Sequence, residues 1–353
     1  MDAIETPAVI IDEAIASRNI TAFQEYCTKH GLNLRPHVKT HKLPYFAKLQ
    51  LAAGAHGITC QKISEAEVMA NAGISDILIT FNILGEAKLK RLNALSDQLE
   101  RLSVTVDNLE TVEGLASAFT NSDQPLNILV ECDTGAGRCG VQSPEEVVAL
   151  AKSVAQKPEL NFDGLMTYPP VGGAAAVNEF MKRSMERLKT EGINCNVISS
   201  GGSPDMWLAH EQTSATEYRI GTYIYNDRSL VERGVCELSD CALTVLATVV
   251  SVPAPDRAII DAGSKVLTSD LLGLDGYGAV LGRPDISIDQ LSEEHGRLVA
   301  DEIGLSVGDT VRIAIGRFDN QCRWCFERRW PVPPVRPLIR NLKLVNRQAK
   351  PQM

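Results

Sequence analysis

Eight short runs of apolar, mostly β-branched residues recur between residues 34 and 225, and amphipathic stretches separate them. In stretches such as 64–74 and 176–192 the apolar positions repeat about every 3.6 residues, which predicts helices. The runs themselves are the expected strands: 34–40, 57–62, 76–82, 103–108, 126–133, 162–169, 196–202 and 217–225. Alternation of strand and helix repeated eight times predicts an α/β chain with a (β/α)8 TIM-like barrel, in preference to a doubly wound open sheet.

The pattern changes after residue 235. The expected strands there are 242–252, 257–263, 276–282 and 308–316, whereas 287–299 reads as partly helical. These elements predict a C-terminal β-rich domain, and a further strand-like run at 6–12 could join it. We therefore expect three parts: a barrel over 12–230, a β domain over 1–11 and 235–316, and an atypical basic tail over 317–353.

Charge and composition narrow the function classes. The net charge of -9 over 353 residues argues against nucleic acid or an anionic membrane as the main partner. The exception is the tail 317–353, whose seven Arg, two Lys, one Asp and one Glu give a net charge of +7. The sequence contains no run of about 18 apolar residues, the length that could span a membrane. With nine cysteines and no signal peptide, we expect a cytoplasmic protein with free thiols.

Candidate chemistry lies where the expected barrel strands end, because a (β/α)8 barrel carries its active site at the C-terminal ends of its strands. The residues at those ends are Lys39, Gln61, Asn82, Asp107, Asp133, Tyr168, Ser200 and Gly221. Lys39 belongs to RPHVKTHK (35–42), which reads either as a solvated basic surface or as a reactive centre. Desolvation and neighbouring cations lower an ammonium pKa, so Lys39 is a candidate amine nucleophile.

Two glycine-containing motifs suggest what that amine would meet. The run SSGGSP (199–204) and the Gly221 of RIGTY leave backbone N–H groups free to surround a phosphate. DTGAGRCG (133–140) allows Arg138 to turn over the site and bond a phenolate or a carboxylate, although an ordinary loop arginine is the alternative. A lysine, a phosphate cradle and an arginine together fit pyridoxal 5'-phosphate (PLP).

The motifs RPHVKTHK, DTGAGRCG, SSGGSP, RIGTYIYND and LSEEHG, in this order, resemble the D-threonine aldolase / D-serine dehydratase family. The resemblance runs from about residue 5 to about 313 and implies an alanine-racemase-like barrel that binds PLP, followed by a C-terminal β domain. It implies that Lys39 forms the Schiff base with the cofactor, that His37 and Arg138 take part in catalysis, and that Asp227 lies near the barrel mouth. The residues that would contact the cofactor are Lys39, Gln61, Arg138, Tyr168, Ser200, Gly201, Gly202, Ser203, Gly221 and Tyr223.

The implied reaction is cleavage of D-β-hydroxy amino acids, such as D-threonine or D-hydroxyaspartate, to glycine and an aldehyde or oxo acid. D-Serine dehydratase, an amino-acid racemase and a non-catalytic PLP-binding protein stay open as alternatives. The resemblance further implies a homodimer and a divalent metal (Mn, Zn or Mg) held by a C-terminal His-x-Cys or His-x-Asp pair. That pair is missing here: AIGRFDNQCRWC follows Ile313, and the last histidine is His295. Cys322 and Cys325 alone make a weak metal site.

Overall fold

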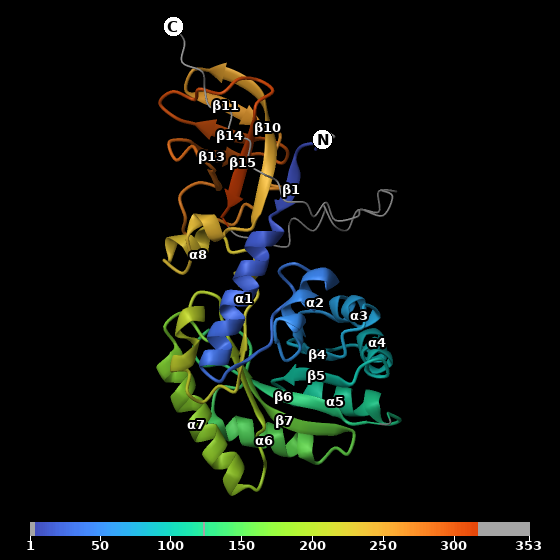
Figure 1. Cartoon of the computed structure of the whole chain (residues 1–353). Helices are drawn as coiled ribbons and strands as arrows, with labels where there is room; N and C mark the ends of the chain where they lie inside the picture. Colours follow the sequence, from blue (N-terminus) through green and yellow to red (C-terminus); the bar gives the residue numbers. More distant parts are fainter. Residues whose placement is uncertain (1–3, 123, 317–353) are drawn as a thin grey trace.

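The computed structural model describes residues 4–122 and 124–316 of the chain. A barrel and a smaller β domain lie at opposite ends of the molecule, and α1 (Glu13–Lys29) runs from the β domain along the barrel (Figure 1). Asp12 lies directly before this helix and caps it, because its carboxylate accepts the N–H of Ile15 at 3.1 Å. A cap of this kind stabilises a helix by about 1 kcal/mol.

Eight parallel strands form the barrel in the order β2-β9-β8-β7-β6-β5-β4-β3. Their bounds are β2 (Asn33–Leu34), β3 (Ile58–Cys60), β4 (Asp76–Ile79), β5 (Arg101–Val106), β6 (Leu126–Cys132), β7 (Leu160–Thr167), β8 (Val197–Gly201) and β9 (Glu217–Arg219). A backbone bridge between His37 and Thr59 links the chain after β2 to β3, at the two ends of this order. The predicted TIM-like barrel is therefore confirmed.

The first and last barrel strands are shorter than the sequence pattern predicted. After β2 only His37 returns to the ladder, since Pro36 has no N–H to donate and offers its carbonyl to Thr59 at 2.7 Å. After β9 the chain turns at Gly221 into a short 3-10 helix, Thr222–Ile224. Both shortened ends leave irregular backbone at the rim of the barrel, where Lys39 and Gly221 lie.

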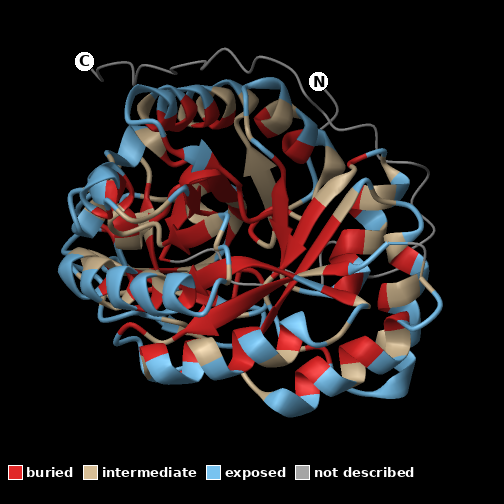
Figure 2. Cartoon of the chain, turned by 90° about the horizontal axis from the view of Figure 1, so that it is seen from below, coloured by how far each residue is buried: buried red, intermediate tan, exposed pale blue. Residues whose placement is uncertain are grey.

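Helices cover the outside of the barrel, and each turns its buried residues towards the strands (Figure 2). They are α2 (Pro44–Ala52), α3 (Ile63–Asn71), α4 (Glu86–Ser96), α5 (Leu109–Phe119), α6 (Pro144–Ala155) and α7 (Ala174–Thr190), and a short α8 (Arg228–Glu232) follows β9. In α6 the hydroxyl of Ser143 accepts the N–H of Glu146 at 3.2 Å, while the Glu146 carboxylate accepts the N–H of Gln142. These two bonds satisfy backbone N–H groups on both sides of Ser143, which explains why α6 starts where it does.

The β domain is an antiparallel sheet of order β1-β10-β11-β14-β13-β12-β15, and pairing of β10 with β15 closes it. Its strands are β1 (Ala8–Ile11), β10 (Leu243–Ala254), β11 (Arg257–Ile260), β12 (Gly278–Val280), β13 (Ser287–Leu291), β14 (Gly296–Val299) and β15 (Thr310–Ile315). The N-terminal strand β1 thus pairs with β10, more than 230 residues later in the chain. The predicted C-terminal β-rich domain is confirmed.

The helical expectation for 287–299 is wrong, because this segment forms the hairpin β13–β14. Exposed Ser287 and Asp289 flank buried Ile288, so the side chains alternate with the period of a strand. Asp289 also accepts two hydrogen bonds from Arg297 on β14, at 2.8 and 2.7 Å. The consecutive glutamates of the turn suggest a helix locally, but cross-strand pairing decides the structure.

The hydrophobic packing divides unevenly. One cluster fills the space between barrel strands and outer helices, and another runs from α1 and β9 into the β domain, which ties the two domains together. Inside the barrel the apolar cluster is small, with Leu78, Leu129 and Met166 at its centre. Charged and hydroxyl side chains take much of the remaining interior. No helix in the described ranges is both long and apolar enough to cross a membrane.

Candidate active site

Lys39 lies in a tight turn that is held in place on both sides. The backbone N–H of His37 donates to the carbonyl of Ile220 at 2.7 Å, and the backbone N–H of Val38 donates to the carbonyl of Thr59 at 2.9 Å. Lys39 itself is half-buried, and Thr40 is buried. The turn therefore fixes the lysine backbone between the ends of β3 and β9.

The basic run 35–42 is mostly interior. Arg35, His37 and His41 are all buried, and Lys42 forms an ion pair with Glu65 at 2.9 Å. Buried cationic groups need partners or must give up their charge. The solvated-surface interpretation of this run is therefore not supported.

His37 is neutral in this environment. Burial lowers its pKa well below the usual range, and the positive charges of Lys39 and Arg219 lower the pKa further, against the opposing hydrogen bond with Gln61. Its Nδ1 accepts the backbone N–H of Lys39 at 3.4 Å, so Nε2 carries the proton and donates to Oε1 of Gln61 at 3.3 Å. Gln61 is oriented in turn, because its amide donates to the carbonyl of Thr80 at 3.1 Å.

Gly221 packs directly on the lysine turn. A Cβ atom at this position would lie 2.6 Å from Oγ1 of Thr40 and 2.9 Å from the carbonyl of His37, closer than side chains tolerate. Gly201 is similarly confined, since its Cβ would lie 1.9 Å from the carbonyl of Arg219. The glycines predicted to hold a phosphate thus bring the ends of β8 and β9 against the Lys39 turn.

Two details of this edge suit an anion. The Ser200 hydroxyl is fully buried and has no hydrogen-bond partner among the described residues, which is costly unless a ligand supplies one. The second detail is the backbone that follows Gly201: Gly202 has a φ of +147°, which favours glycine, and Ser203 is half-buried. These observations fit the predicted phosphate cradle.

Arg138 and Tyr168 lie together at the rim. The guanidinium carbon of Arg138 is 4.8 Å from the centre of the Tyr168 ring, and its Nη2 is 3.9 Å from Glu131. Tyr168 also lines a small hollow together with Gly201 and Gly202. The Arg138 side chain is 58% exposed, so it has room to move over a ligand in that hollow.

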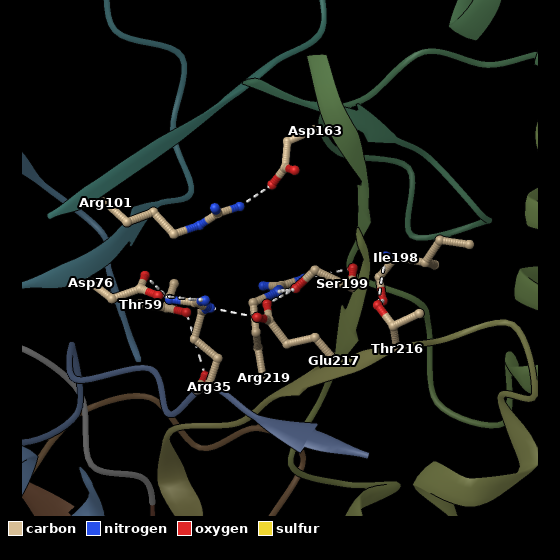
Figure 3. Close-up of polar contacts among 10 residues, drawn as sticks. All are labelled: Arg35, Thr59, Asp76, Arg101, Asp163, Ile198, Ser199, Thr216, Glu217 and Arg219. Atoms are coloured by element: carbon tan, nitrogen blue, oxygen red, sulfur yellow. Dashed lines mark hydrogen bonds and ion pairs between the residues drawn. The ribbon is translucent and has the colours of Figure 1, made fainter. Parts of the chain in front are cut away.

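A buried ion network beneath this rim was not predicted from the sequence. The guanidinium of Arg35 donates to Glu217 at 2.5 Å and to Asp76 at 2.6 Å (Figure 3). Ser199 donates to Glu217 at 2.6 Å and accepts from Arg219 at 2.8 Å, which extends the network across the barrel (Figure 3). Arg35 and Arg219 are thus connected through Glu217 and Ser199, although Arg35 is more than 160 positions from each of these residues.

Arg219 is the member of the network whose charge acts on His37, in the Lys39 turn. Arg219 is the first residue of the RIGTY motif, two positions before Gly221. The motif alone did not identify it as a site residue; its burial in the folded chain does. Burial lowers its pKa, whereas the charges of Glu217 and Glu131 oppose that shift. Because Arg219 also lowers the pKa of His37, a fixed positive charge lies below the lysine turn.

Tyr223 and Asp227 have structural partners. Tyr223 is fully buried against Phe23, and its hydroxyl accepts a hydrogen bond from Gln50 at 2.9 Å. Asp227 is buried and caps α8, since its carboxylate accepts the N–H of Leu230 at 3.1 Å. Neither side chain offers an unoccupied polar group of the kind found at Ser200.

The described residues contain no candidate set of ligands for the expected metal. Between residues 4 and 316, leaving out residue 123, no group of three or more His, Cys, Asp or Glu side chains could hold a metal ion. The C-terminal segment discussed for the ligand pair, including Cys322 and Cys325, lies outside the described residues.

Comparison with known proteins places this site in a family. Residues 11–229 match the family described as "Alanine racemase, N-terminal domain", and residues 242–321 match the "Putative serine dehydratase domain". The first match covers more than half of the chain. The chain belongs to the alanine racemase N-terminal domain family.

Individual members of the family refine the resemblance. The D-threonine aldolase of an Arthrobacter species is 35% identical over 83% of this chain and 79% of its own length. The 3-hydroxy-D-aspartate aldolase of Paracoccus denitrificans is 33% identical over 90% of this chain and 86% of its own. The crystal structure of D-threonine aldolase from Filomicrobium marinum superposes with a TM-score of 0.83 at 30% identity, over 90% of this chain and 89% of that one. The resemblance seen in the sequence motifs is confirmed.

Proposed function

We propose that the protein is a PLP-dependent lyase of the D-threonine aldolase type, which cleaves D-β-hydroxy amino acids to glycine and an aldehyde or oxo acid. The observation that carries the proposal is the contact between the Lys39 turn and Gly221, which joins an amine to an anion-binding edge. The two aldolase relatives support the reaction type and the substrate class.

The residues present fit PLP. The orphaned Ser200 hydroxyl and the crowded glycines Gly201 and Gly221 suit its phosphate, and the half-buried amine of Lys39 suits its aldehyde. When bound, PLP withdraws electrons from the substrate carbon atom attached to the amino group. Arg138, which already lies over Tyr168, is placed to bond an oxygen of the bound cofactor or substrate.

His37 acts mainly by positioning. Both of its ring nitrogens already form hydrogen bonds, Nδ1 with the backbone N–H of Lys39 and Nε2 with the side chain of Gln61. Neither nitrogen is therefore available for proton transfer. Because the imidazole stays neutral, it adds no positive charge beside the Lys39 amine. A neutral neighbour limits electrostatic repulsion on that amine and keeps the turn in shape.

Dehydration of D-serine is the second candidate, because residues 242–321 match the putative serine dehydratase domain. The two reactions differ in which substrate proton is removed: the β-hydroxyl proton for carbon–carbon cleavage and the Cα proton for loss of water. A racemase or a non-catalytic PLP-binding protein is less well supported, since the aldolase relatives align over both domains.

The test is product analysis on the full chain supplied with PLP. D-Threonine and D-3-hydroxyaspartate should yield glycine, whereas L-threonine should not. Release of ammonia and an oxo acid from D-serine, without glycine from D-threonine, would establish the dehydratase instead. Each assay is run with and without Mn²⁺ or Zn²⁺, which tests the metal dependence suggested by the resemblance.

Lys39→Ala examines the central residue. We expect loss of the visible absorbance of the bound cofactor and a decrease in turnover of ~10³-fold or more, since a group that makes and breaks bonds is removed. Lys42→Gln is the matched control within the same basic run, because the Lys42 amine is already paired with Glu65. Full activity in Lys39→Ala would refute the proposal.

We also propose a homodimer, and this rests on apolar exposure near the strand ends. Phe81 and Leu84 follow β4 and Leu109 follows β5, and about half of each side chain is exposed. Grouped apolar exposure of this kind marks an association surface. Sedimentation at micromolar concentration should give twice the chain mass of 38.4 kDa.

A further inference from the structure

Three polar residues at the barrel strand ends take no part in the proposed chemistry: Asn82 after β4, Asp107 after β5 and Asp133 after β6. Two of them are joined directly, because the side-chain amide of Asn82 donates to Oδ1 of Asp107 at 2.7 Å. The side-chain amide of Asn108 donates to the same oxygen at 2.7 Å. The second oxygen of Asp107, Oδ2, accepts the backbone N–H of Gly140 at 3.0 Å. Protein donors therefore engage both oxygens of this carboxylate.

Gly140 ends the loop that carries Arg138, so the bond from Asp107 fixes one end of that loop. The φ of Gly140 is +119°, and a Cβ atom there would lie 2.4 Å from the backbone nitrogen of Asp133, so this position requires glycine. Beside it, the N–H of Asp133 donates to the carbonyl of Val141 at 3.0 Å. A backbone bond therefore closes the base of the loop, and the Asp107 carboxylate lies against that base.

The loop is also folded on itself. Oδ1 of Asp133 accepts the backbone N–H groups of Gly135 and Gly137, at 2.9 and 3.1 Å. A Cβ atom on Gly135 would lie 3.5 Å from Cγ of Pro170, which lines the hollow described above. The backbone on both sides of Arg138 is therefore held in shape, although the Arg138 side chain itself is exposed.

The contacts of Asp107 cross three neighbouring strands. Asn82 follows β4, Asp107 follows β5 and Gly140 belongs to the loop after β6, and these strands are adjacent in the barrel. A carboxylate that accepts from a side-chain amide with one oxygen and from a backbone N–H with the other has little freedom to turn. Asn82 therefore holds Asp107 in the orientation that meets Gly140, and the strand ends give the loop a rigid support.

These contacts separate the side chain that meets the ligand from the residue that places it. We propose that Asp107 is a positioning residue of the cofactor site: by holding Gly140, it sets where the Arg138 guanidinium meets an oxygen of bound PLP. This inference rests on the proposed function of Arg138, and it gives Asp107 no contact with the ligand. A displacement of about 1 Å in a binding group can cost about 10²-fold in rate, so a support of this kind matters to the site.

The first test uses Asp107→Asn, which keeps the size of the side chain. An amide has one acceptor oxygen where the carboxylate has two, so its NH2 group must face either Asn82 or Gly140, both of which donate. At least one of the two bonds is then lost. Titration of the unliganded full chain with PLP should show about tenfold weaker binding, the scale of one hydrogen bond to a charged group.

A double-mutant cycle with Arg138→Leu shows whether Asp107 acts through the arginine. Arg138→Leu should also weaken PLP binding, and adding Asp107→Asn to it should weaken binding no further, since the group that Asp107 places is absent. Effects that multiply in the double variant would show that Asp107 reaches the site by another route. That result would overturn the proposal, as would wild-type PLP affinity in either single variant.

A second measurement follows the loop itself and does not depend on turnover. Trypsin cleaves after an arginine when the local backbone can open, so the peptide bond between Arg138 and Cys139 reports on the loop. We expect cleavage at this bond to be about tenfold faster in Asp107→Asn than in the wild type, because a bond that holds the loop is lost. Equal rates would show that Asp107 does not hold the loop and would overturn the proposal.

Asp309→Asn is the matched control, because the Asp309 carboxylate also accepts a backbone N–H, that of Ser306 at 2.8 Å, but in the β domain. It should leave PLP affinity and cleavage after Arg138 at their wild-type values. Far-UV circular dichroism checks the fold of every variant, and Asp107→Ala replaces Asp107→Asn if the latter unfolds, since alanine brings no further donor. A chain that forms no glycine from D-threonine or D-3-hydroxyaspartate, yet shows the coupling between Asp107 and Arg138, would refute the proposed reaction and support the positioning role.

Discussion

Arg35 and Arg138 are two arginines of the same barrel in opposite surroundings. Arg35 lies in the interior with 6% of its side chain exposed, between Asp76 and Glu217. Arg138 lies at the rim in a glycine-containing loop, with 58% of its side chain exposed and Glu131 at 3.9 Å as its ion-pair partner. Both belong to motifs that the sequence alone assigns to the candidate site. The comparison teaches that the interior charges hold the barrel together, whereas the rim charge is available for a ligand.

The largest expected effect is that of Arg35→Leu on stability. Burial disfavours the charge of Arg35, but Glu217 and Asp76 more than offset this and raise its pKa, so the charge is firmly held. The substitution leaves a buried Glu217 carboxylate without its cation, at a cost of about 3–5 kcal/mol in the free energy of unfolding. Urea unfolding followed by circular dichroism measures it. A loss below about 1 kcal/mol would show that the interior network contributes little.

Much of the barrel could be predicted from the sequence, and this network could not. Buried parallel strands appear as β-branched apolar runs, so all eight runs were recognisable from local pattern. Arg35 and Glu217 are 182 positions apart, and nothing in either motif indicates that they meet. The hairpin 287–299 was missed for a related reason, because its stabilising partner Arg297 acts across the strands. Local chemistry predicts elements, while long-range ion pairs require the folded chain.

The candidate site shows the same division. Lys39, Gln61 and Gly221 follow strands that could be located, so their common rim followed from the barrel alone. The neutral state of His37 did not follow, since it depends on burial and on Arg219 beneath it. The lack of a hydrogen-bond partner for the Ser200 hydroxyl also could not be predicted, because it depends on the positions of all the described residues around it.

The next largest effect is the pH dependence contributed by His41. Burial lowers its pKa from 6.5 to about 4, against opposing hydrogen bonds from Gln50 and Leu43. Above pH 6.5 the imidazole is neutral in both states, so its contribution is complete. As the pH falls towards 4, only the unfolded chain binds the proton, which costs about 2 kcal/mol of stability at pH 5.

His41→Gln should remove that contribution. Between pH 7 and pH 5 its free energy of unfolding should fall by about 2 kcal/mol less than that of the wild type. His56→Gln, at an exposed position, is the control and should retain the wild-type slope. Equal slopes for His41→Gln and the wild type would show that His41 is not kept neutral by the fold.

Ser200→Ala sharpens the comparison at the cofactor edge. The hydroxyl has no hydrogen-bond partner among the described residues, so its removal should not lower stability. It should weaken PLP binding about tenfold, the scale of one hydrogen bond to a charged group. Ser184→Ala is the matched control, because that hydroxyl donates to Phe180 at 2.8 Å: it should lower stability and leave PLP affinity unchanged. Titration of the unliganded protein with PLP measures both affinities.

The smallest effect on stability is expected for Arg138→Leu, the counterpart of Arg35→Leu. An exposed arginine 3.9 Å from its ion-pair partner contributes little to folding, so the free energy of unfolding should change by less than about 0.5 kcal/mol. Turnover should nevertheless fall by about 10²-fold, because a cation that would bond an oxygen of the bound cofactor or substrate is lost. Arg138→Lys keeps the charge but not the planar fork, and should recover only part of the activity. If Arg138→Leu instead destabilised the chain as much as Arg35→Leu while retaining activity, the rim and the interior would have exchanged roles, and the assignment of Arg138 to ligand binding would be wrong.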